Sequence, residues 1–154
     1  MSETRWTIRP VRLSDAPALR QMREEAGWDQ EKVPAWIGAS LSGERPTWVA
    51  VMRGQPVGMV SLELVDPDRE VANGGEIAAV TSLSVLTSAA RRGIGRELTV
   101  FAEEQARARG VRVLTLNTRP SNAAAIALYE GLGYRQWKQE ERPWGLAVYL
   151  RKSL

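Results

Sequence analysis

Apolar residues recur along the chain at two spacings, one typical of helices and the other of strands. A repeat of three or four residues gives a helix with one buried face, whereas alternation of apolar and polar residues gives a half-buried strand. The helical spacing predicts four helices, over residues 16–26, 28–41, 94–109 and 123–132. In front of the first of these helices, Ser14 and Asp15 are both residues that can cap it.

Seven segments have the composition of strands, and they cover residues 6–12, 47–52, 56–65, 77–86, 111–117, 134–140 and 144–150. The second and third of these are separated by Arg53-Gly54-Gln55, which predicts an antiparallel hairpin. The polar stretch 66–75 is expected to be a surface loop. The segment 77–86 carries no charge, which is typical of a strand covered on both faces.

The order of these elements predicts the fold class. The strand at 77–86, the helix at 94–109 and the strand at 111–117 form one crossover unit, in which the two strands run parallel. We therefore expect an α/β fold with a mixed, twisted sheet of about seven strands flanked by four helices. A length of 154 residues suits one domain, residues 1–154, and is too short for two ordinary domains.

Composition limits the chemistry that this chain can perform. It contains no cysteine and no histidine, which excludes thiol catalysis, disulfides and the commonest general base, and we expect no metal site. The first five residues do not resemble a signal segment, and no apolar run approaches a membrane-spanning length. We therefore expect a soluble, cytoplasmic protein that does not bind membranes.

The net charge is only +3, and the basic residues are scattered apart from one group, Arg91, Arg92 and Arg96, so nucleic acid is not an expected partner. These three arginines crowd the start of the helix at 94–109, where each cation costs about 0.3 to 1 kcal/mol unless an anion offsets it. Gly93 and Gly95 leave the first helical N–H groups open to phosphate oxygens. The segment 90–96, called the anion loop below, is thus expected to bind a phosphate group; a tight turn with solvated arginines is the alternative.

Two other phosphate motifs do not fit the anion loop. There is no Gly-Lys-Ser or Gly-Lys-Thr of a P-loop, and the third glycine of the dinucleotide fingerprint is missing. The run Ala90-Arg91-Arg92-Gly93-Ile94-Gly95 instead resembles the signature of the acetyl-CoA-dependent N-acetyltransferases of the GNAT superfamily. That signature is Gln or Arg, two residues, Gly, one residue, then Gly or Ala. Ala90 departs from it, and Arg91 stands where a glycine is common.

A second segment, Asn122–Tyr134, strengthens the resemblance. It reads Asn, two residues, Ala, two residues, Leu-Tyr, three residues, Gly and an aromatic residue. The order of strands and helices also fits, so the resemblance to a small, single-domain bacterial GNAT protein covers essentially the whole chain. It implies that the strands at 77–86 and 111–117 splay apart to admit acetyl-CoA, the co-substrate.

The resemblance implies a role for each matching residue. Backbone amides of the anion loop would bind the diphosphate of acetyl-CoA, and Leu83 and Val85 would pair with its pantetheine arm. Tyr129 would be the general acid that protonates the departing sulfur; a buried core tyrosine is the alternative. Asn122 would contact the cofactor or simply cap its helix. The expected cofactor contacts are Leu83, Ser84, Val85, Ala90, Arg91, Arg92, Gly93, Ile94, Gly95, Arg96, Asn117, Asn122, Ala125 and Tyr129.

The acceptor side is less defined by the sequence. The helices at 16–26 and 28–41 resemble the pair that covers the acceptor cleft in GNAT enzymes, which makes Trp28, Asp29 and Trp36 candidate substrate contacts together with Glu63. Ordinary core tryptophans are the alternative. The position at which some relatives carry a catalytic glutamate falls near Ala79, which cannot act as a base. Glu76 is therefore the catalytic candidate, and Glu63 is the second carboxylate that could act. A solvated charge at the end of a strand is the alternative.

These residues predict acetyl transfer from acetyl-CoA to a primary amine by direct attack in a ternary complex, because no cysteine exists to carry the acetyl group. A non-catalytic acyl-CoA-binding regulatory module of the same fold is the alternative. The acceptor could be a peptide N-terminus, a lysine, a polyamine or aminoglycoside, or an amino-acid analogue. A homodimer through the last two strands is compatible with the sequence.

Overall fold

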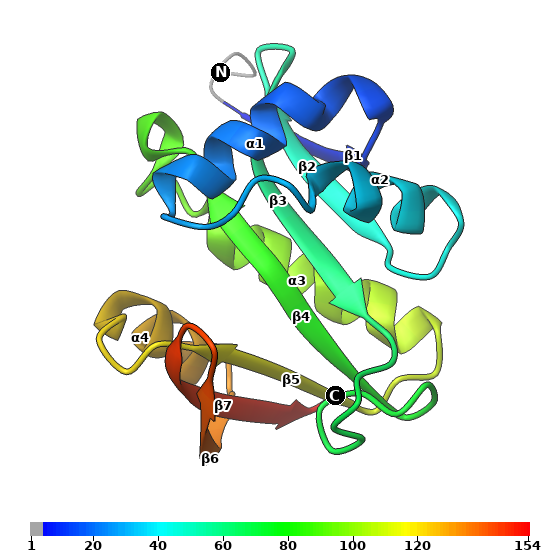
Figure 1. Ribbon diagram of the computed structural model, residues 1–154, viewed down its shortest axis with the longest axis vertical. Helices are drawn as coiled ribbons and strands as arrows, with labels where there is room; N and C mark the ends of the chain where they lie inside the picture. The colour runs from blue at the N-terminus through cyan, green and yellow to red at the C-terminus, as the bar shows by residue number, and fades with distance from the viewer. Residues whose placement is uncertain (1–4) are drawn as a thin grey trace. The chain divides into compact units, whose positions relative to one another are not determined.

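The computed structural model describes residues 5–154 (Figure 1); the first four residues, part of the segment checked for a signal sequence, lie outside the described residues. The strands are β1 (Thr7–Pro10), β2 (Thr47–Met52), β3 (Gln55–Glu63), β4 (Ile77–Val85), β5 (Val113–Thr118), β6 (Arg135–Arg142) and β7 (Gly145–Ser153). The helices are α1 (Ala16–Glu25), α2 (Val33–Leu41), α3 (Ile94–Ala108) and α4 (Ala123–Gly131). Among the described residues, none of the helices has the length and apolarity needed to cross a bilayer.

The strands are hydrogen-bonded in the order β1-β2-β3-β4-β5-β7-β6. β4 and β5 run parallel, whereas β2 is antiparallel to both β1 and β3, and β7 is antiparallel to both β5 and β6. The predicted α/β class is confirmed, with a mixed sheet of seven strands, four helices and a parallel β4-β5 pair.

The described chain forms two compact units, and each is built from two separate stretches of sequence. The first unit contains the described residues up to Glu63 together with Ser82–Ala102. The second contains Leu64–Thr81 and Glu103–Leu154. One domain over residues 1–154 stays a prediction.

In the first unit, helices cover both faces of the strands β1, β2 and β3. α1 and α2 pack on one face, and the first turns of α3 pack on the other (Figure 1). The turn between β2 and β3 has Arg53 at φ 52° and Gly54 at φ 77°. Two left-handed residues in a row make a type I′ turn, whose twist suits a two-residue hairpin, so the predicted hairpin is confirmed.

β3 and α3 approach each other most closely at Gly58. A Cβ atom built on Gly58 would lie 3.0 Å from Leu98 Cδ1, 3.1 Å from Ile94 Cγ2 and 3.3 Å from the carbonyl oxygen of Ser84. Leu98 and Ile94 are both buried. A side chain at this position therefore fits only if its neighbours shift by a few tenths of an ångström.

α2 begins at Val33, so the prediction of a helix from residue 28 is wrong at its start. Pro34 explains the difference, because a proline is tolerated only in the first turn of a helix. In the segment before it, the Asp29 carboxylate accepts a hydrogen bond of 2.7 Å from the Glu31 N–H. Such local bonds compete with helix formation.

β4 differs from the strand that the sequence predicted. Ala78, Ala79 and Val80 are buried, but the residues 81–85 are only half-buried. The prediction of a strand covered on both faces is therefore correct for the first half of β4 and wrong for the second.

Asp15 occupies the N-cap position of α1, but its side chain does not cap this helix. Its carboxylate instead forms an ion pair of 2.8 Å with Arg9 and accepts a hydrogen bond of 2.7 Å from the Arg12 N–H. The side chain of Asp15 is only 3% exposed. Burial opposes ionisation, but these hydrogen bonds outweigh it and hold the pKa of Asp15 below its usual value.

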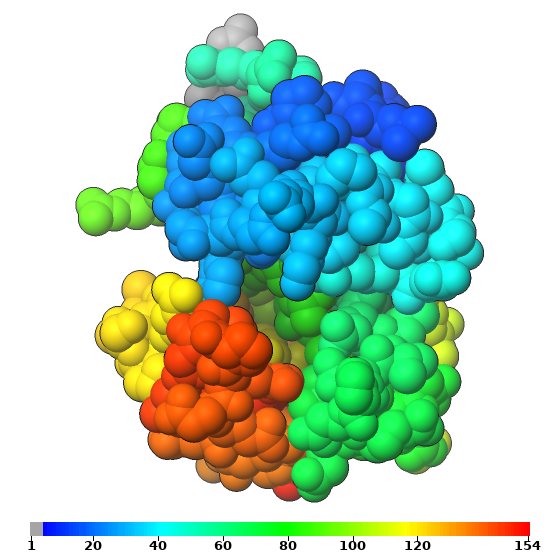
Figure 2. All heavy atoms as spheres, in the orientation of Figure 1, coloured from blue at the N-terminus to red at the C-terminus, as the bar shows by residue number. Residues whose placement is uncertain are grey.

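The second unit packs its core against the antiparallel strands β5, β7 and β6. Tyr149 of β7 is fully buried, and the ring of Trp137 meets it edge-on with the ring centroids 5.9 Å apart. The loop 64–76 runs beside the β6-β7 hairpin (Figure 2). Lys138 joins them, because its ammonium group bonds to Asp68 of the loop at 2.5 Å and to Glu140 of β6 at 3.0 Å.

The close contact at Gly58 predicts a stability effect that the exposed helical Gly38 should not share. We expect Gly58→Ala to lower the free energy of unfolding by about 1 to 3 kcal/mol, because Leu98 and Ile94 must move. In Gly38→Ala the new methyl group meets nothing within 4 Å, and a gain of up to about 1 kcal/mol is expected. Urea denaturation of both variants measures this, and equal effects would contradict the close packing.

The Asp15 ion pair predicts how stability depends on pH. Because the pKa of Asp15 is lowered by folding, its contribution is complete above the pKa of the unfolded state, about 3.9, and is lost as the pH falls through the folded value. We expect Asp15→Asn to cost about 2 to 3 kcal/mol at pH 7. Its difference from the wild type should shrink in urea titrations below about pH 4; a difference independent of pH would show that the carboxylate charge is not involved.

Candidate functional site

The anion loop leads directly into α3 in the first unit. Arg91 has φ 64° and Gly93 has φ 88°, so two of its residues are left-handed. α3 starts at Ile94, as predicted, and Ile94 is buried. The three arginine side chains of the loop are exposed, and the first amide N–H groups of a helix have no acceptor within it. This arrangement presents backbone donors and positive charge on the same short segment, which suits a phosphate group.

Hydrogen bonds from three elements hold the segment around the anion loop. The Leu86 N–H donates to the Val57 carbonyl of β3 at 2.8 Å. The Thr87 N–H donates to the Glu25 carboxylate at the end of α1 at 2.9 Å. On the other side of the loop, the Thr99 hydroxyl donates to the Gly95 carbonyl at 2.8 Å. The backbone of the loop is therefore anchored on both sides.

The second half of β4 has the features expected of the strand that receives the pantetheine arm. Within residues 5–154, its parallel ladder with β5 covers only Ile77–Ala79 opposite Val113–Thr115. Ser82 then adopts φ 56°, a left-handed conformation that is rare for a residue other than glycine. Leu83, Ser84 and Val85 follow and are half-buried. The regular strand is thus interrupted where the resemblance expects cofactor contacts.

Tyr129 lies on α4 in the second unit and is only 7% exposed. Burial raises the pKa of its phenol to about 12. Its ring meets the ring of Tyr134 edge-on, with the centroids 6.2 Å apart, and its carbonyl accepts a 3.0 Å hydrogen bond from the Tyr134 N–H. The phenol therefore keeps its proton throughout the neutral range, as a proton donor must.

A buried network lies next to Tyr129. The Tyr134 hydroxyl donates to the Glu103 carboxylate at 2.8 Å, and the Lys152 ammonium group donates to both oxygens of the same carboxylate at 3.1 Å. Glu103 is 3% exposed. Burial, helped by the charge of Glu103, raises the pKa of Tyr134. The network fixes the ring against which Tyr129 packs.

Asn122 caps α4, because its side chain accepts a 3.2 Å hydrogen bond from the Ala125 N–H. The structure thus shows the helix cap that was the alternative, and a cofactor contact stays a prediction. Ala125 is half-buried in the first turn of α4. Asn117 is half-buried on β5, opposite Tyr149 of β7.

Two of the predicted acceptor residues share one neighbour in the first unit. The guanidinium carbon of Arg23 lies 4.5 Å from the ring centroid of Trp36 and 5.7 Å from that of Trp28. Both tryptophans are half-buried. Arg23 belongs to α1 and Trp36 to α2, and the two helices lie side by side on one face of the first unit (Figure 2). The tryptophans therefore form a partly open aromatic surface rather than a sealed core.

The predicted carboxylates lie in different settings. Asp29 is exposed, and its carbonyl accepts a 2.7 Å hydrogen bond from Arg23 Nε. Glu63 is half-buried at the end of β3 and attracts Arg45 electrostatically. Glu76 precedes β4, and its side chain is 71% exposed with Arg112 Nε 4.0 Å away. The setting of Glu76 is that of a solvated charge at a strand end.

Three residues of the first unit were not found by sequence reasoning. Arg23 belongs to no motif within the predicted helix 16–26, and nothing in the sequence links Arg45 to Trp36. The left-handed conformation of Ser82 could not be predicted, because such positions are usually occupied by glycine or asparagine. Arg45 Nη2 donates to the Ser82 hydroxyl at 2.6 Å, so the two are in contact.

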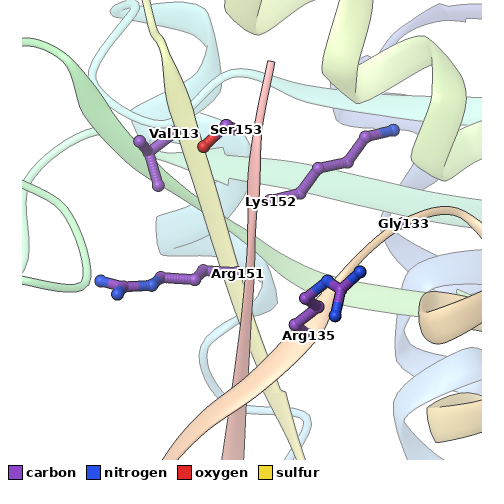
Figure 3. Close-up of a pocket in the computed structure, with 6 residues that line it drawn as sticks. All are labelled: Val113, Gly133, Arg135, Arg151, Lys152 and Ser153. Atoms are coloured by element: carbon purple, nitrogen blue, oxygen red, sulfur yellow. The ribbon is translucent and has the colours of Figure 1, made fainter.

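The second unit also carries a basic hollow that the sequence did not predict (Figure 3). It has a volume of about 470 Å³ and is lined by Val113, Gly133, Arg135, Arg151, Lys152 and Ser153. Arg151 and Lys152 point to opposite sides of β7 (Figure 3). None of the predicted site residues lines this hollow.

A mixed sheet with a short parallel β4-β5 ladder, a glycine-containing loop at the start of α3 and the segment Asn122–Tyr134 define a class of proteins, the CoA-dependent acyltransferases. The chain belongs to the acetyltransferase (GNAT) family, whose family model matches residues 13–134. It is an acetyl-CoA-dependent acyltransferase, and the predicted recognition is confirmed.

Individual proteins show the same relationship. The chain is 29% identical over 133 residues to the [ribosomal protein bS18]-alanine N-acetyltransferase of Escherichia coli, covering 84% of this chain and 81% of that one. The ribosomal-protein-alanine N-acetyltransferase of Brucella melitensis superimposes with a TM-score of 0.82 at 27% identity, over 96% of this chain and 99% of that chain. The yncA protein of Salmonella typhimurium, solved with its cofactor acetyl-CoA, has a TM-score of 0.79 at 22% identity, over 97% and 94% of the two chains.

The left-handed residue of the anion loop predicts an effect on the affinity for acetyl-CoA. Gly93 has φ 88°, and an alanine there costs about 1 to 2 kcal/mol or shifts the backbone of the loop. We expect Gly93→Ala to raise the Kd for acetyl-CoA about tenfold in calorimetric titrations. Gly43→Ala is the matched control, because Gly43 has φ 86° and lies outside the loop. An unchanged Kd in a folded Gly93→Ala protein would show that the loop backbone does not bind the diphosphate.

Proposed function

We propose that the chain transfers the acetyl group of acetyl-CoA to a primary amine by direct attack within a ternary complex. Membership of the acetyltransferase family supports the donor, and the anion loop is the observation that carries the proposal. The sequence contains no cysteine to hold the acetyl group as a thioester between two half-reactions. The amine nitrogen would form a bond to the acetyl carbon, and the bond from that carbon to sulfur would break.

The donor would be held mainly by backbone groups. The amides of Gly93, Ile94 and Gly95 are proposed to bind the diphosphate, and Arg91, Arg92 and Arg96 to add positive charge around it. The backbone of Leu83–Val85 is proposed to pair with the pantetheine arm and to polarise the thioester carbonyl. Asn117, Asn122 and Ala125 complete the proposed contacts.

Tyr129 is proposed to donate a proton or a hydrogen bond to the departing sulfur. A thiolate with a pKa of about 8.5 is a weaker base than a phenolate whose pKa is about 12. Full proton transfer before the bond breaks is therefore unfavourable, and a hydrogen bond that strengthens as charge develops on sulfur fits better. The raised pKa supports this role, because it keeps the hydroxyl proton in place.

The acceptor's proton would leave through water. We propose Glu76 as the carboxylate that receives it and keep Glu63 as the alternative, since each is near one end of a central strand. An exposed carboxylate such as Glu76 exchanges readily with solvent and can act through a water chain. Orientation of a partly neutral amine would supply most of the acceleration at this step.

The departure at Ala90 suggests one alternative to test against, a non-catalytic acyl-CoA-binding module. The two functions differ in thiol release. Incubation of acetyl-CoA with a panel of primary amines and detection of free CoA thiol would support the enzyme if release depends on Tyr129. Binding of acetyl-CoA with no thiol release from any amine would support the module.

Replacement of the proposed proton donor tests the mechanism. We expect Tyr129→Phe to lower kcat about 100-fold while the Kd for acetyl-CoA changes less than about threefold, because the aromatic ring remains. Steady-state thiol release and calorimetry measure the two quantities. Tyr149→Phe is the matched control, as the same hydroxyl is removed from another buried tyrosine of the second unit. A Tyr129→Phe enzyme with wild-type kcat would rule out the proposed role.

A further inference from the structure

The guanidinium group of Arg23 lies against two tryptophans, and the edge with its two terminal nitrogens is open. Its guanidinium group lies over Trp36 at 4.5 Å and near Trp28 at 5.7 Å, and its Nε donates to the Asp29 carbonyl. Its two terminal nitrogens form no hydrogen bond with any residue of the range 5–154. These two nitrogens are the fork with which arginine binds carboxylates and phosphates.

A second arginine lies against the same tryptophan. The guanidinium carbon of Arg45 is 4.4 Å from the ring centroid of Trp36. The tryptophan therefore has one cation from α1 and another from the segment before β2 within 4.5 Å of its ring centre. Stacking fixes the direction of both planar groups, and it leaves the terminal edge of Arg23 to make further hydrogen bonds.

Burial acts on both arginines of this cluster. It lowers the pKa of Arg23 despite the attraction of Asp29. It also lowers the pKa of Arg45, opposed by Glu63 and reinforced by Arg23, which has the same charge. A bound anion at the open edge of Arg23 would offset the cost of burying this guanidinium group.

The cluster is connected to the strand on which the acetyl group would be presented. Arg45 donates to the Ser82 hydroxyl, and Ser82 is the left-handed residue directly before Leu83. The proposed function places the thioester along Leu83–Val85. An acceptor that reaches this part of β4 from the side of α1 and α2 would meet the arginines.

We propose that Arg23 binds a carboxylate of the acceptor and that Arg45 adds positive charge beside it, so that the preferred substrate is an amino acid or amino-acid analogue whose amine and carboxylate lie close together. This inference rests on the proposed function and names its substrate class. Two cations at the acceptor surface repel polyamines and aminoglycosides and attract a substrate that carries its own negative charge. The bidentate fork of Arg23 gives the contact a defined geometry.

Matched acceptors test the proposal. The common amino acids are compared with their amides and with the corresponding decarboxylated amines in the thiol-release assay with acetyl-CoA. We expect at least one amino acid to have a kcat/KM at least tenfold above its amide and its decarboxylated amine. The amide has the less basic amine, so protonation of the amine cannot produce this preference.

Variants assign the preference to the arginine cluster. In Arg23→Gln the kcat/KM for the amino acid should be within threefold of the kcat/KM for its amide. Arg23→Lys should give an intermediate ratio, because lysine keeps the charge but lacks the two-nitrogen fork. Arg20→Gln, an exposed arginine on the same helix, should keep the wild-type ratio. The ratio does not depend on how much of each preparation is folded.

Three results would overturn the proposal. One is equal or faster acetylation of the amides, polyamines or peptide N-termini, and another is an acid preference that survives in Arg23→Gln. The third is acetyl-CoA binding without acetylation of any amino acid. Each of these leaves the donor site intact, whereas failure of the protein to bind acetyl-CoA in calorimetry would contradict the proposed function and this inference together.

Discussion

The backbone of β3 at Gly58 lies so close to Ile94 and Leu98 of α3 that even a methyl group there would displace them. This contact fixes the start of α3, where Ile94 is buried. The segment that leads into the anion loop from β4 is held by the residue before Gly58, because the Leu86 N–H donates to the Val57 carbonyl. The anion loop therefore links two points that packing has already fixed, and the direction of its amides is set before any ligand arrives.

Positively charged side chains lie in electrostatically unfavourable surroundings at two positions in the first unit. The anion loop puts three arginines at the start of a helix, and the cluster around Trp36 puts two guanidinium groups over one ring. At both positions we propose that a negatively charged ligand offsets part of the cost of this arrangement. Arg9 differs, because its ion pair with Asp15 lies within the protein and stabilises the fold.

The elements themselves could be predicted from the sequence, because periodicity and turn residues act locally. Arg53-Gly54 identified the hairpin, and Gly93 with Ile94 identified the start of α3. Pro34 also held the correct start of α2, but the helical spacing of apolar residues outweighed it in the prediction. The left-handed Ser82 could not be predicted, since serine shows no preference for that conformation.

The site could be predicted only where a local motif carried it. The anion loop and Tyr129 belong to such motifs, so the sequence could single out both as candidates. The stacking of Arg23 and Arg45 on Trp36 joins residues from separate elements, so neither periodicity nor spacing could show it. Contacts of this kind depend on the tertiary fold.

The place of β7 in the sheet has a consequence for biosynthesis. β7 is hydrogen-bonded between β5 and β6, although it follows both of them in the chain. It also supplies Lys152, which neutralises the buried carboxylate of Glu103. Until β7 has left the ribosome, β6 has no strand to pair with, the edge of β5 stays open and Glu103 lacks its contact with Lys152. The sheet of the second unit is therefore completed last, and a chain truncated before Gly145 would keep unpaired strand edges, which favour aggregation.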